Sequence, residues 1–362
     1  MNALRYLPFL ARGLRKAGPP LHLTLFVTGA CNLRCRHCFH WKEVAAGIPG
    51  PSVEQVAALA DSAARMGPLV WVSFGGGEPF LRPDLPELAR AFGRHGLRHL
   101  AIPTNGLIPR QHELIDAMLA ACPDTYLSVS VSFDGPPDVH DAIRDKPGAH
   151  ARSMAAVRAL KAQARGREDR LGIGILVCVT KENQDVLAGH LEQLVDELAP
   201  DNVTVNLARG TALDESLLDV DVARYEQVVA AKARLVTQGR IPYFDFPLAK
   251  LAVARDRLMY EHVARVARGD GSRHLPCTAG TLSAVVFEDG SVHPCEILGR
   301  SIGNLNDAGW DLARLWDAPP ARALRDEIAK TRCACTWECA QADNVLFNAR
   351  TWPRLAAAVL RP

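Results

Sequence analysis

The sequence predicts an α/β protein with a large parallel β/α part and a smaller, cysteine-containing C-terminal extension. Two observations support this fold class. Short runs of apolar and β-branched residues alternate with helical segments from residue 21 to residue 208, and five of the ten cysteines come after residue 276. A chain of 362 residues also exceeds the size at which a single hydrophobic core stops growing, so a second unit is expected.

Six apolar runs are predicted to be strands, and the segments between them are predicted to be helices. Strands that alternate with helices indicate parallel β/α units, and six units are too few for a full eight-stranded barrel. Functional side chains are expected at the carboxyl ends of such strands. The strands are expected at 21–27, 68–74, 99–104, 126–133, 171–179 and 203–208, and the helices near 52–66, 84–95, 110–121, 150–164 and 184–198.

Composition and charge exclude several classes of protein. Hydrophobic residues make up 48% of the chain and charged residues 23%, which is typical of a globular protein. The formal net charge of +2 and the lack of a long basic block argue against nucleic-acid binding. No run of 18 uncharged apolar residues and no signal-peptide pattern occurs. We therefore expect a cytoplasmic protein whose cysteines bind metal rather than form disulfides.

The first 20 residues form a basic amphipathic segment ahead of the first predicted strand. Apolar side chains could share one helical face, although Pro8 argues against one continuous helix. We expect the segment to pack against its own domain; the alternative is peripheral contact with a membrane surface through residues 1–17. The apolar set is Leu4, Tyr6, Leu7, Leu10 and Leu14, and the basic set is Arg5, Arg12, Arg15 and Lys16.

Three cysteines follow the first strand at a spacing that suits an iron–sulfur cluster. Cys31, Cys35 and Cys38 form C-x3-C-x2-C in the run CNLRCRHCFHW. Three thiolates on one short loop can hold three corners of a cubane and leave the fourth iron open to a substrate or cofactor. The alternative is a structural zinc site, although such sites usually close the fourth position with a second pair of ligands.

Followed by the aromatic Phe39, this spacing resembles the signature of radical S-adenosylmethionine (SAM) enzymes. The resemblance implies a partial (β/α)6 barrel over residues 21–210, in which the three cysteines hold a [4Fe–4S] cluster whose open iron chelates SAM. It also implies one-electron reduction by a partner such as flavodoxin or ferredoxin. SAM would then be cleaved to methionine and a 5′-deoxyadenosyl radical, which abstracts hydrogen from an unactivated carbon.

Turns at the ends of the second and third strands resemble further motifs of this family. The GGEP motif binds the amino group of SAM in the family; here its glycines allow close backbone approach, and Glu78 with nearby carbonyls can accept hydrogen bonds from an ammonium group. A plain turn explains either segment equally well. The residues concerned are Gly76, Gly77, Glu78 and Pro79 after the second strand, and Thr104 and Asn105 after the third.

The fourth strand ends in SVSFDGP followed by VHDAIR, which resembles the SxDGP…HDxxR stretch of members with cluster-bearing C-terminal extensions. Alternation would place Ser130, Ser132 and Asp134 on the face toward the barrel interior. By resemblance, Ser132 is a candidate for a polar contact with SAM, and Arg144 or Arg152 for pairing with its carboxylate. Either arginine could instead be a solvated surface charge. Further candidates, at the end of the sixth strand, are Asn206 and Arg209.

The remainder of the chain is predicted to be a helical linker, a cluster domain and a tail. Residues 211–275 are expected to form helices near 221–238 and 247–268, joined by a turn in which Tyr243 or Asp245 could face substrate, although a packed linker is preferred. Residues 276–345 resemble the SPASM and twitch auxiliary-cluster domains, with C-x12-G-x4-C and a hairpin that would bring Cys295 back toward Cys277. Residues 346–362 are expected to be a C-terminal tail.

The extension has five cysteines where a full SPASM domain has seven, which predicts one auxiliary [4Fe–4S] cluster rather than two. We expect its ligands to be Cys277, Cys295, Cys339 and either Cys333 or Cys335, with a zinc site at the same positions as the alternative. Two cysteines outside these motifs are expected to be small buried hydrophobic residues: Cys122 and Cys178.

The resemblance predicts a radical SAM oxidoreductase or maturase that acts on a peptide or natural-product intermediate. Only 20 residues precede the first strand, so no fused N-terminal peptide-recognition domain is expected. The first alternative is an oxidoreductase that modifies a small carbohydrate-like or lipid substrate by the same chemistry. The second is an iron–sulfur electron-transfer protein, which would not need the GGEP and SxDG turns.

Overall fold

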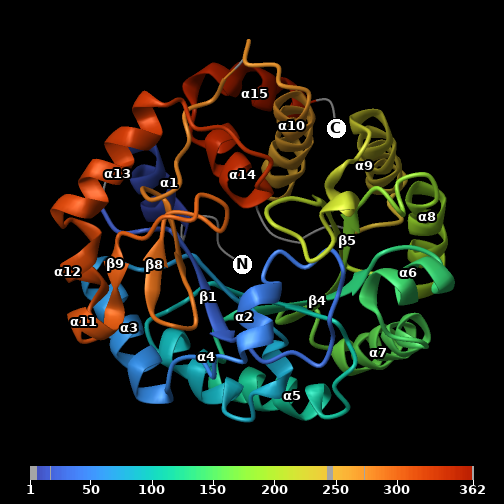
Figure 1. The fold of residues 1–362 in the computed structure, drawn as a ribbon, viewed down its shortest axis with the longest axis horizontal. Coiled ribbons are helices and arrows are strands. Elements are labelled where there is room, and N and C mark those ends of the chain that lie inside the picture. Colours follow the sequence, from blue (N-terminus) through green and yellow to red (C-terminus); the bar gives the residue numbers. More distant parts are fainter. Residues whose placement is uncertain (1–5, 17, 243–247, 273, 361–362) are drawn as a thin grey trace.

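One nine-stranded sheet organises the chain, with strand order β6-β5-β4-β3-β2-β1-β7-β8-β9 (Figure 1). The computed structural model describes residues 6–16, 18–242, 248–272 and 274–360. Strands β1 to β7 are parallel, while β8 and β9 are antiparallel additions. The strands are β1 His22–Thr28, β2 Trp71–Gly76, β3 His99–Thr104, β4 Tyr126–Phe133, β5 Leu171–Val179, β6 Asn202–Leu207, β7 Ser283–Val286, β8 Ser291–His293 and β9 Gly303–Asn304.

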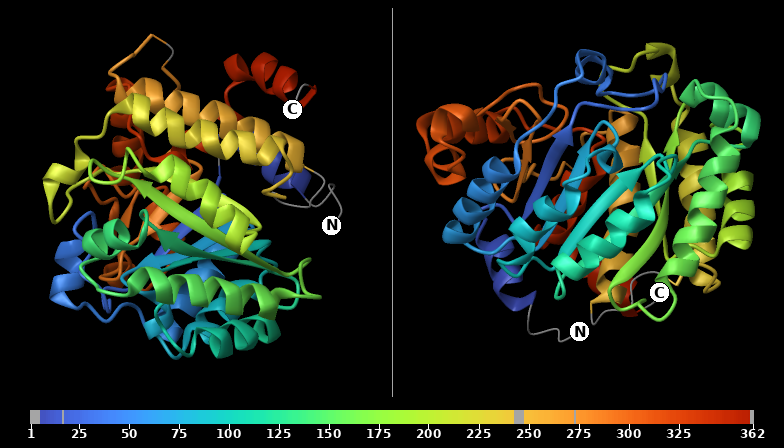
Figure 2. Two further views of the ribbon diagram at one scale, coloured as in Figure 1. Left: turned by 90° about the vertical axis from the view of Figure 1, so that its right-hand side faces the viewer. Right: turned by 90° about the horizontal axis from the view of Figure 1, so that it is seen from below.

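Helices cover the convex face of the curved sheet, which confirms the predicted partial barrel of β/α units (Figures 1 and 2). The five predicted helices are present as α3 Val53–Met66, α4 Leu85–Gly93, α5 Gln111–Ala121, α7 Ala149–Ala164 and α8 Leu187–Leu198. The predicted linker helices are α9 Val222–Thr237 and α10 Ala249–Ala267. Tyr243 and Asp245, in the turn between them, lie outside the described residues.

Several short elements were not predicted. Those within the barrel are α2 Trp41–Ala46, α6 Pro137–Arg144 and the 3-10 turns at Pro79–Leu81 and Glu215–Leu218. Those in the C-terminal part are α11 Leu305–Ala308, α12 Leu312–Trp316, α13 Pro319–Lys330, α14 Glu338–Leu346, a 3-10 turn at Ala349–Thr351 and α15 Trp352–Leu360.

The two faces of β4 differ: its concave face is polar and its convex face is apolar. In β4, Leu127, Val129 and Val131 are buried under the helices, whereas Ser128 and Ser130 between them are half-buried on the other face. This alternation is expected for a strand whose two faces meet different environments. It places the serines of β4 inside the barrel, as the sequence predicts.

An aromatic layer closes the barrel at the amino ends of the strands. Trp71, His99 and Tyr126 lie side by side across β2, β3 and β4, with ring centroids 5.5 Å apart for the first pair and 5.7 Å for the second. Tyr6 reaches this layer, and its hydroxyl lies 3.0 Å from His99 Nε2. A Cβ at Gly172 of β5 would lie 2.2 Å from the Tyr126 hydroxyl, so only glycine leaves room for this ring. The aromatic layer therefore forms a floor opposite the carboxyl ends.

The linker helix α10 and the C-terminal extension together close both edges of the six-stranded sheet. At one edge β7 pairs in parallel with β1, and the predicted hairpin to β8 is confirmed. At the other, the edge amides of Val205 and Leu207 donate to the Tyr260 hydroxyl (3.1 Å) and to the Glu338 carboxylate (2.9 Å). Unpaired edge strands are sites of unwanted association, so side chains of α10 and α14 cover an edge that six strands alone would expose.

The N-terminal helix α1 spans Leu7–Arg15 and packs against the protein, as expected. Pro8 does not break it, because it occupies the first turn, where an amide donor is not needed. The Arg12 guanidinium donates to the carbonyls of Pro19, Pro20 and Pro68, and a Cβ at Gly13 would collide with Phe347. Among the described residues, no helix is both long and apolar enough to span a bilayer.

Candidate active site and cluster centres

The three-cysteine loop leaves β1 at its carboxyl end and leads into α2. Cys31, Cys35 and Cys38 are all half-buried. The loop backbone is tied to α6, because the Arg36 amide donates to the Ile143 carbonyl (2.8 Å), and it is closed on itself by a hydrogen bond from the Cys38 amide to the Cys35 carbonyl (3.1 Å). Three thiols are thus held on one anchored loop at the carboxyl end of a central strand, which is the arrangement that a three-cysteine cubane site needs.

The GGEP turn is packed directly against the start of this loop. The Gly77 amide donates to the Thr28 carbonyl (2.7 Å), and the Glu78 amide to the Ala30 carbonyl (2.8 Å). A Cβ at Gly77 would lie 2.0 Å from the Ala30 oxygen, so a side chain cannot be accommodated there. The glycine therefore lets two neighbouring strand ends share backbone hydrogen bonds beside the cysteines.

Glu78 ties the ends of β2 and β3 together. Its fully buried carboxylate accepts hydrogen bonds from the Thr104 hydroxyl (2.8 Å) and from the Asn105 and Phe80 amides (2.8 and 3.1 Å). Burial raises its pKa above the ordinary value, and these hydrogen bonds oppose the shift. Asn105 also donates to Asn32 in the cysteine loop (2.7 Å). These predicted residues are brought together, and Pro79 is buried beside them.

Arg144 supplies positive charge beside the thiols. Its Nε donates to the fully buried Asp134 carboxylate (2.7 Å), and its charge acts on all three cysteines. Burial alone would raise the pKa of Asp134, but Arg144, assisted by His37 and His140, holds it below the ordinary value. Arg152, the other candidate, is exposed and donates to the Gly148 and Pro147 carbonyls, away from this site.

Burial favours the protonated form of the loop thiols. Burial raises the pKa of Cys35 to about 12 and that of Cys38 to about 11, against the opposing charge of Arg144. Metal binding displaces such protons, because the thiolate is the ligand. No three His, Cys, Asp or Glu side chains within the described part of the chain converge tightly enough to hold a single metal ion. A cubane gives each thiolate its own iron and so needs them further apart.

Four cysteines of the extension share one neighbourhood. The Cys277 thiol donates a hydrogen bond to Cys333, which lowers the pKa of Cys333 to about 7. Cys295 and Cys335 pack in one apolar cluster with Trp337, and Cys277 contacts the same cluster. Backbone amides donate to the sulfurs of Cys277, Cys295 and Cys335, as the Leu298 amide does to Cys295 at 3.4 Å. Such amide donors stabilise cluster-bound thiolates.

Cys339 faces a different environment. Its side chain is exposed to the concave space, and its principal electrostatic neighbours are Glu296, Arg209 and Glu338 rather than other thiols. Arg209 and Glu338 form a buried ion pair, which raises the pKa of Arg209 although burial acts in the opposite direction. Burial raises the pKa of the nearby Glu296, whose carboxylate lies 4.0 Å from Arg209.

An aromatic cluster joins the two cysteine sites. Phe26 of β1 makes edge contacts with His40 and Phe287 at ring-centroid distances of 4.7 Å in both cases. His40, two residues after Cys38, bonds to Glu288 in the hairpin turn (2.9 Å), and Phe39 packs on the same cluster. The extension is therefore seated on the three-cysteine loop itself. Sequence reasoning missed this contact, since His40 and Glu288 carry no local pattern that pairs them.

The remaining predicted residues are divided between the interior and the core. Ser132 is nearly buried at the end of β4, and Asn206 lies opposite Cys178 in the β5–β6 register. Cys122 packs in the hydrophobic core, as expected. Cys178 differs from expectation: it lies on the concave face, with Asp134, Arg209 and Glu338 as electrostatic neighbours. Cys178 and Leu176 are two residues apart in β5 and therefore lie on the same, concave face of the strand, which explains the difference.

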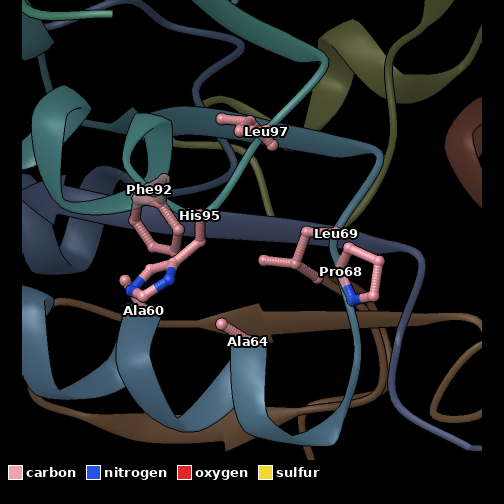
Figure 3. Close-up of a pocket in the computed structure, with 7 residues that line it drawn as sticks. All are labelled: Ala60, Ala64, Pro68, Leu69, Phe92, His95 and Leu97. Carbon is pink, nitrogen blue, oxygen red and sulfur yellow. The ribbon is translucent and has the colours of Figure 1, made fainter.

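The hollow shown in Figure 3 lies outside the barrel, on the helical side of the sheet. It is lined by apolar side chains such as Ala64, Leu69 and Phe92, together with His95. None of the predicted site residues lines it. This hollow is therefore separate from the chemistry at the strand ends.

The comparisons with known proteins agree with this geometry. The Radical SAM superfamily matches residues 25–194, and SPASM, an iron-sulfur cluster-binding domain, matches residues 277–340. Mycofactocin maturase MftC of Mycobacterium ulcerans is 31% identical over 325 residues, covering 87% of this chain and 79% of that protein. This chain belongs to the radical SAM superfamily. The radical SAM domain binds a [4Fe–4S] cluster and SAM, and the SPASM domain binds auxiliary iron–sulfur clusters.

Two other curated relatives of this radical SAM protein cover most of its length. AdoMet-dependent heme synthase of Methanosarcina barkeri is 26% identical over 85% of each chain. Sporulation killing factor maturation protein SkfB of Bacillus subtilis is 24% identical over 87% of this chain and 69% of that protein.

Solved structures share the fold. Streptococcus suis SuiB bound to S-adenosylmethionine superposes with a TM-score of 0.64 at 16% identity, over 90% of this chain and 72% of that one. The structure of anSMEcpe with bound AdoMet and a peptide superposes with a TM-score of 0.60 at 17% identity, over 94% of this chain and 99% of that one.

Proposed function

We propose that this radical SAM protein is a peptide maturase: it cleaves SAM reductively and abstracts hydrogen from a peptide substrate. The relatives MftC and SkfB are named as maturation proteins, and a SuiB structure of the same fold is described with its precursor peptide SuiA. When bound, the cluster and SAM supply the reductive cleavage that yields methionine and a 5′-deoxyadenosyl radical.

The chemistry of the concave wall carries the choice of a peptide. The half-buried or nearly buried inward positions include hydroxyl groups on β1, β2, β4 and β6, an amide on β6 and the Arg209 guanidinium. Such a wall offers hydrogen bonds to amide groups, whereas a lipid chain or a large apolar ring would leave it unpaired. The residues are Thr24, Ser73, Ser128, Ser130, Ser132, Thr204 and Asn206.

The described side chains suggest how the site holds its reactants. Arg144, fixed by Asp134, places a positive charge beside the three thiols and is suited to offset their negative charge. The anchored glycines of the GGEP turn keep the backbone of β2 close to that loop. The aromatic floor covers the amino ends of β2, β3 and β4, so we expect reactants to enter at the carboxyl ends.

The first experiment tests SAM cleavage and hydrogen abstraction together. Anaerobically reconstituted protein, dithionite and SAM should yield 5′-deoxyadenosine, and Cys35→Ala should abolish it, because two remaining loop thiols cannot secure the cluster. A peptide encoded beside the gene, deuterated at candidate positions, should transfer deuterium into 5′-deoxyadenosine. A cluster that is spectroscopically intact but yields no 5′-deoxyadenosine would favour the electron-transfer alternative.

A second candidate substrate is a tetrapyrrole, because a heme synthase relative spans 85% of both chains. Titration with porphyrins under anaerobic conditions distinguishes a peptide substrate from a tetrapyrrole substrate. A peptide maturase should leave the porphyrin absorption band unshifted, while an enzyme of heme synthesis should bind and convert it.

We also propose that one auxiliary cluster is held by Cys277, Cys295, Cys333 and Cys335. Their shared neighbourhood and the amide donors to three of the sulfurs support this set. The sequence left open whether Cys333 or Cys335 is a ligand. The proposed set includes both and leaves out Cys339, whose neighbours are Glu296, Arg209 and Glu338.

A further inference from the structure

The exposed apolar surface is concentrated on the two terminal helices. Six large hydrophobic side chains are exposed in the described ranges, and four of them lie on α1 and α15. Leu7 and Leu14 on α1 are 53% and 52% exposed, and Trp352 and Leu360 on α15 are 44% and 81% exposed. Grouped exposure of this kind marks an interaction surface more often than scattered single residues do.

Each helix turns one side to the protein and an apolar side outward. On α1, Phe9 and Gly13 are buried, whereas Leu7, Ala11 and Leu14 are exposed at helical spacing. On α15, Leu355 is buried, whereas residues 352, 356 and 360 are exposed four apart. Phe347, which lies against Gly13 of α1, precedes α15 in the chain by a few residues, so both helices belong to the same end of the molecule.

The same segments carry only positive charge. The first acidic residue of the chain is Glu43 and the last is Asp343, so neither helix contains a carboxylate. Arg15 and Lys16 at the end of α1, and Arg350 just before α15, are exposed. Apolar side chains flanked by cations suit the interface of an anionic bilayer, where each basic residue near the surface adds roughly 1 kcal/mol of attraction.

Both helices lie beyond the amino ends of the strands, at the end of the molecule opposite the three-cysteine loop, which follows the carboxyl end of β1 (Figure 2). A membrane at this end would leave the carboxyl-end mouth facing the aqueous phase. The other two exposed side chains, Val186 and Leu213, follow the carboxyl ends of β5 and β6 and so lie away from this face.

We propose that α1 and α15 together form a docking face for an anionic membrane surface, to which the protein binds with its active site turned toward the aqueous phase. This inference goes beyond the proposed function and does not depend on the substrate. It extends the contact considered for residues 1–17 to a second helix, which only the fold brings beside the first.

Vesicle flotation with the reconstituted full chain tests the proposal. Binding to phosphatidylcholine vesicles that contain phosphatidylglycerol is expected, with little binding to phosphatidylcholine alone and a loss of binding in high salt. Leu7→Gln with Leu14→Gln should weaken binding by about tenfold or more, because two leucines no longer enter the interface. Arg15→Gln with Lys16→Gln should remove most of the preference for anionic lipid.

The matched control is Val186→Gln with Leu213→Gln, which removes equally exposed apolar side chains elsewhere and should leave vesicle binding unchanged. Circular dichroism of the Leu7 and Leu14 variant should match the unaltered chain, which excludes a folding defect. The proposal is overturned if anionic vesicles do not bind the protein, or if the control pair weakens binding equally. It is also overturned if light scattering shows a dimer that the Leu7 and Leu14 changes dissociate, since a second copy would then cover this face.

Discussion

At the scale of single residues, Glu338 connects the extension to the barrel. One of its carboxylate oxygens accepts the Leu207 amide at the edge of β6, and the other pairs with Arg209. Glu338 stands between Cys335 and Cys339 in the sequence, so this ion pair fixes where the cysteine run lies relative to the barrel interior. A buried carboxylate with two such partners is a strong constraint, because losing it leaves Arg209 with only the Glu296 carboxylate, 4.0 Å away, as an ionic partner.

Replacing Glu338 by alanine should therefore destabilise the protein by about 3 kcal/mol or more. Urea unfolding of the reconstituted protein measures this. Glu327→Ala is the matched control: its pair with Arg300 is exposed, so a change below about 1 kcal/mol is expected. Equal effects of the two substitutions would contradict the bridging role of Glu338.

The proposed ligand set includes four of the five cysteines of the extension and leaves out Cys339, which gives a separate prediction. Cys335→Ser should reduce bound iron by about one cluster, roughly four iron atoms. Cys339→Ser should leave iron content and the cluster absorption unchanged, because its thiol faces the interior. Iron analysis with electron paramagnetic resonance distinguishes them, and a loss of iron in the Cys339 variant would return this residue to the ligand set.

At the scale of elements, strand ends are held together by backbone contacts that require small residues. The GGEP turn meets the start of the cysteine loop so closely that Gly77 cannot carry a side chain. The geometry of the cluster loop thus depends on the end of β2 as much as on β1.

Gly77→Ala should destabilise the protein by about 2 kcal/mol or more and reduce SAM cleavage, because the new Cβ displaces the loop backbone. Gly189→Ala is the control: it lies in α8, and a Cβ there meets no atom within 4 Å. A gain of about 0.5–1 kcal/mol is expected for it from helix propensity. Thermal unfolding and 5′-deoxyadenosine yield measure both, and unimpaired cleavage by Gly77→Ala would refute the role given to this contact.

The aromatic floor predicts a dependence of stability on pH. Burial, with His22 and Arg98 as neighbours, lowers the pKa of His99 to about 4, whereas an unfolded histidine titrates near 6.5. Neutral His99 is therefore favoured in the folded chain. The contribution of neutral His99 to the free energy of unfolding is complete above pH 6.5. It is lost as the pH falls toward 4, at up to about 1.4 kcal/mol per pH unit.

Unfolding measured from pH 7.5 down to pH 5 in the unaltered chain and in His99→Gln checks this. The variant should show a shallower decline with falling pH. If the stabilities of the two proteins fall in parallel with pH, His99 has the same pKa in the folded and the unfolded chain, which would contradict the prediction.

Local patterns predict the elements well but not how distant elements meet. The six strands and five helices follow from apolar periodicity and breaker residues, and β5 was predicted at its observed bounds. The cysteine loop, Glu78 with Thr104, and the serines of β4 were placed at the strand ends or inside the barrel for the same reason. The pairing of β7 with β1, of His40 with Glu288 and of Glu338 with Arg209 joins segments far apart in sequence, for which no single-chain periodicity exists. The two helices of the docking face could likewise not be paired from sequence.

At the scale of the whole molecule, the extension completes the sheet rather than standing beside it. It supplies β7 to one edge and the Glu338 side chain to the other, where Tyr260 of the linker helix α10 also binds, and its hairpin rests on the three-cysteine loop. The two cysteine sites therefore belong to one continuous structure, and motion of one relative to the other requires breaking sheet hydrogen bonds.

A chain truncated after residue 275 should consequently be insoluble or oligomeric, because it exposes the β1 edge and its row of backbone donors and acceptors. Removal of residues 352–362 alone serves as the control and should leave a soluble monomer. Gel filtration with light scattering compares them. A monomeric, folded 1–275 fragment would show that the barrel does not need the extension.

The parallel pairing of β1 with β7 also has a consequence for synthesis on the ribosome. Roughly 260 residues separate the two strands, so at about 5–20 residues per second β1 waits on the order of ten to fifty seconds for its neighbour to emerge. During that interval the nascent chain presents an unsatisfied β edge next to three reactive thiols. Chaperone capture of the emerging N-terminal half, together with late insertion of iron, is the order of events that this topology favours.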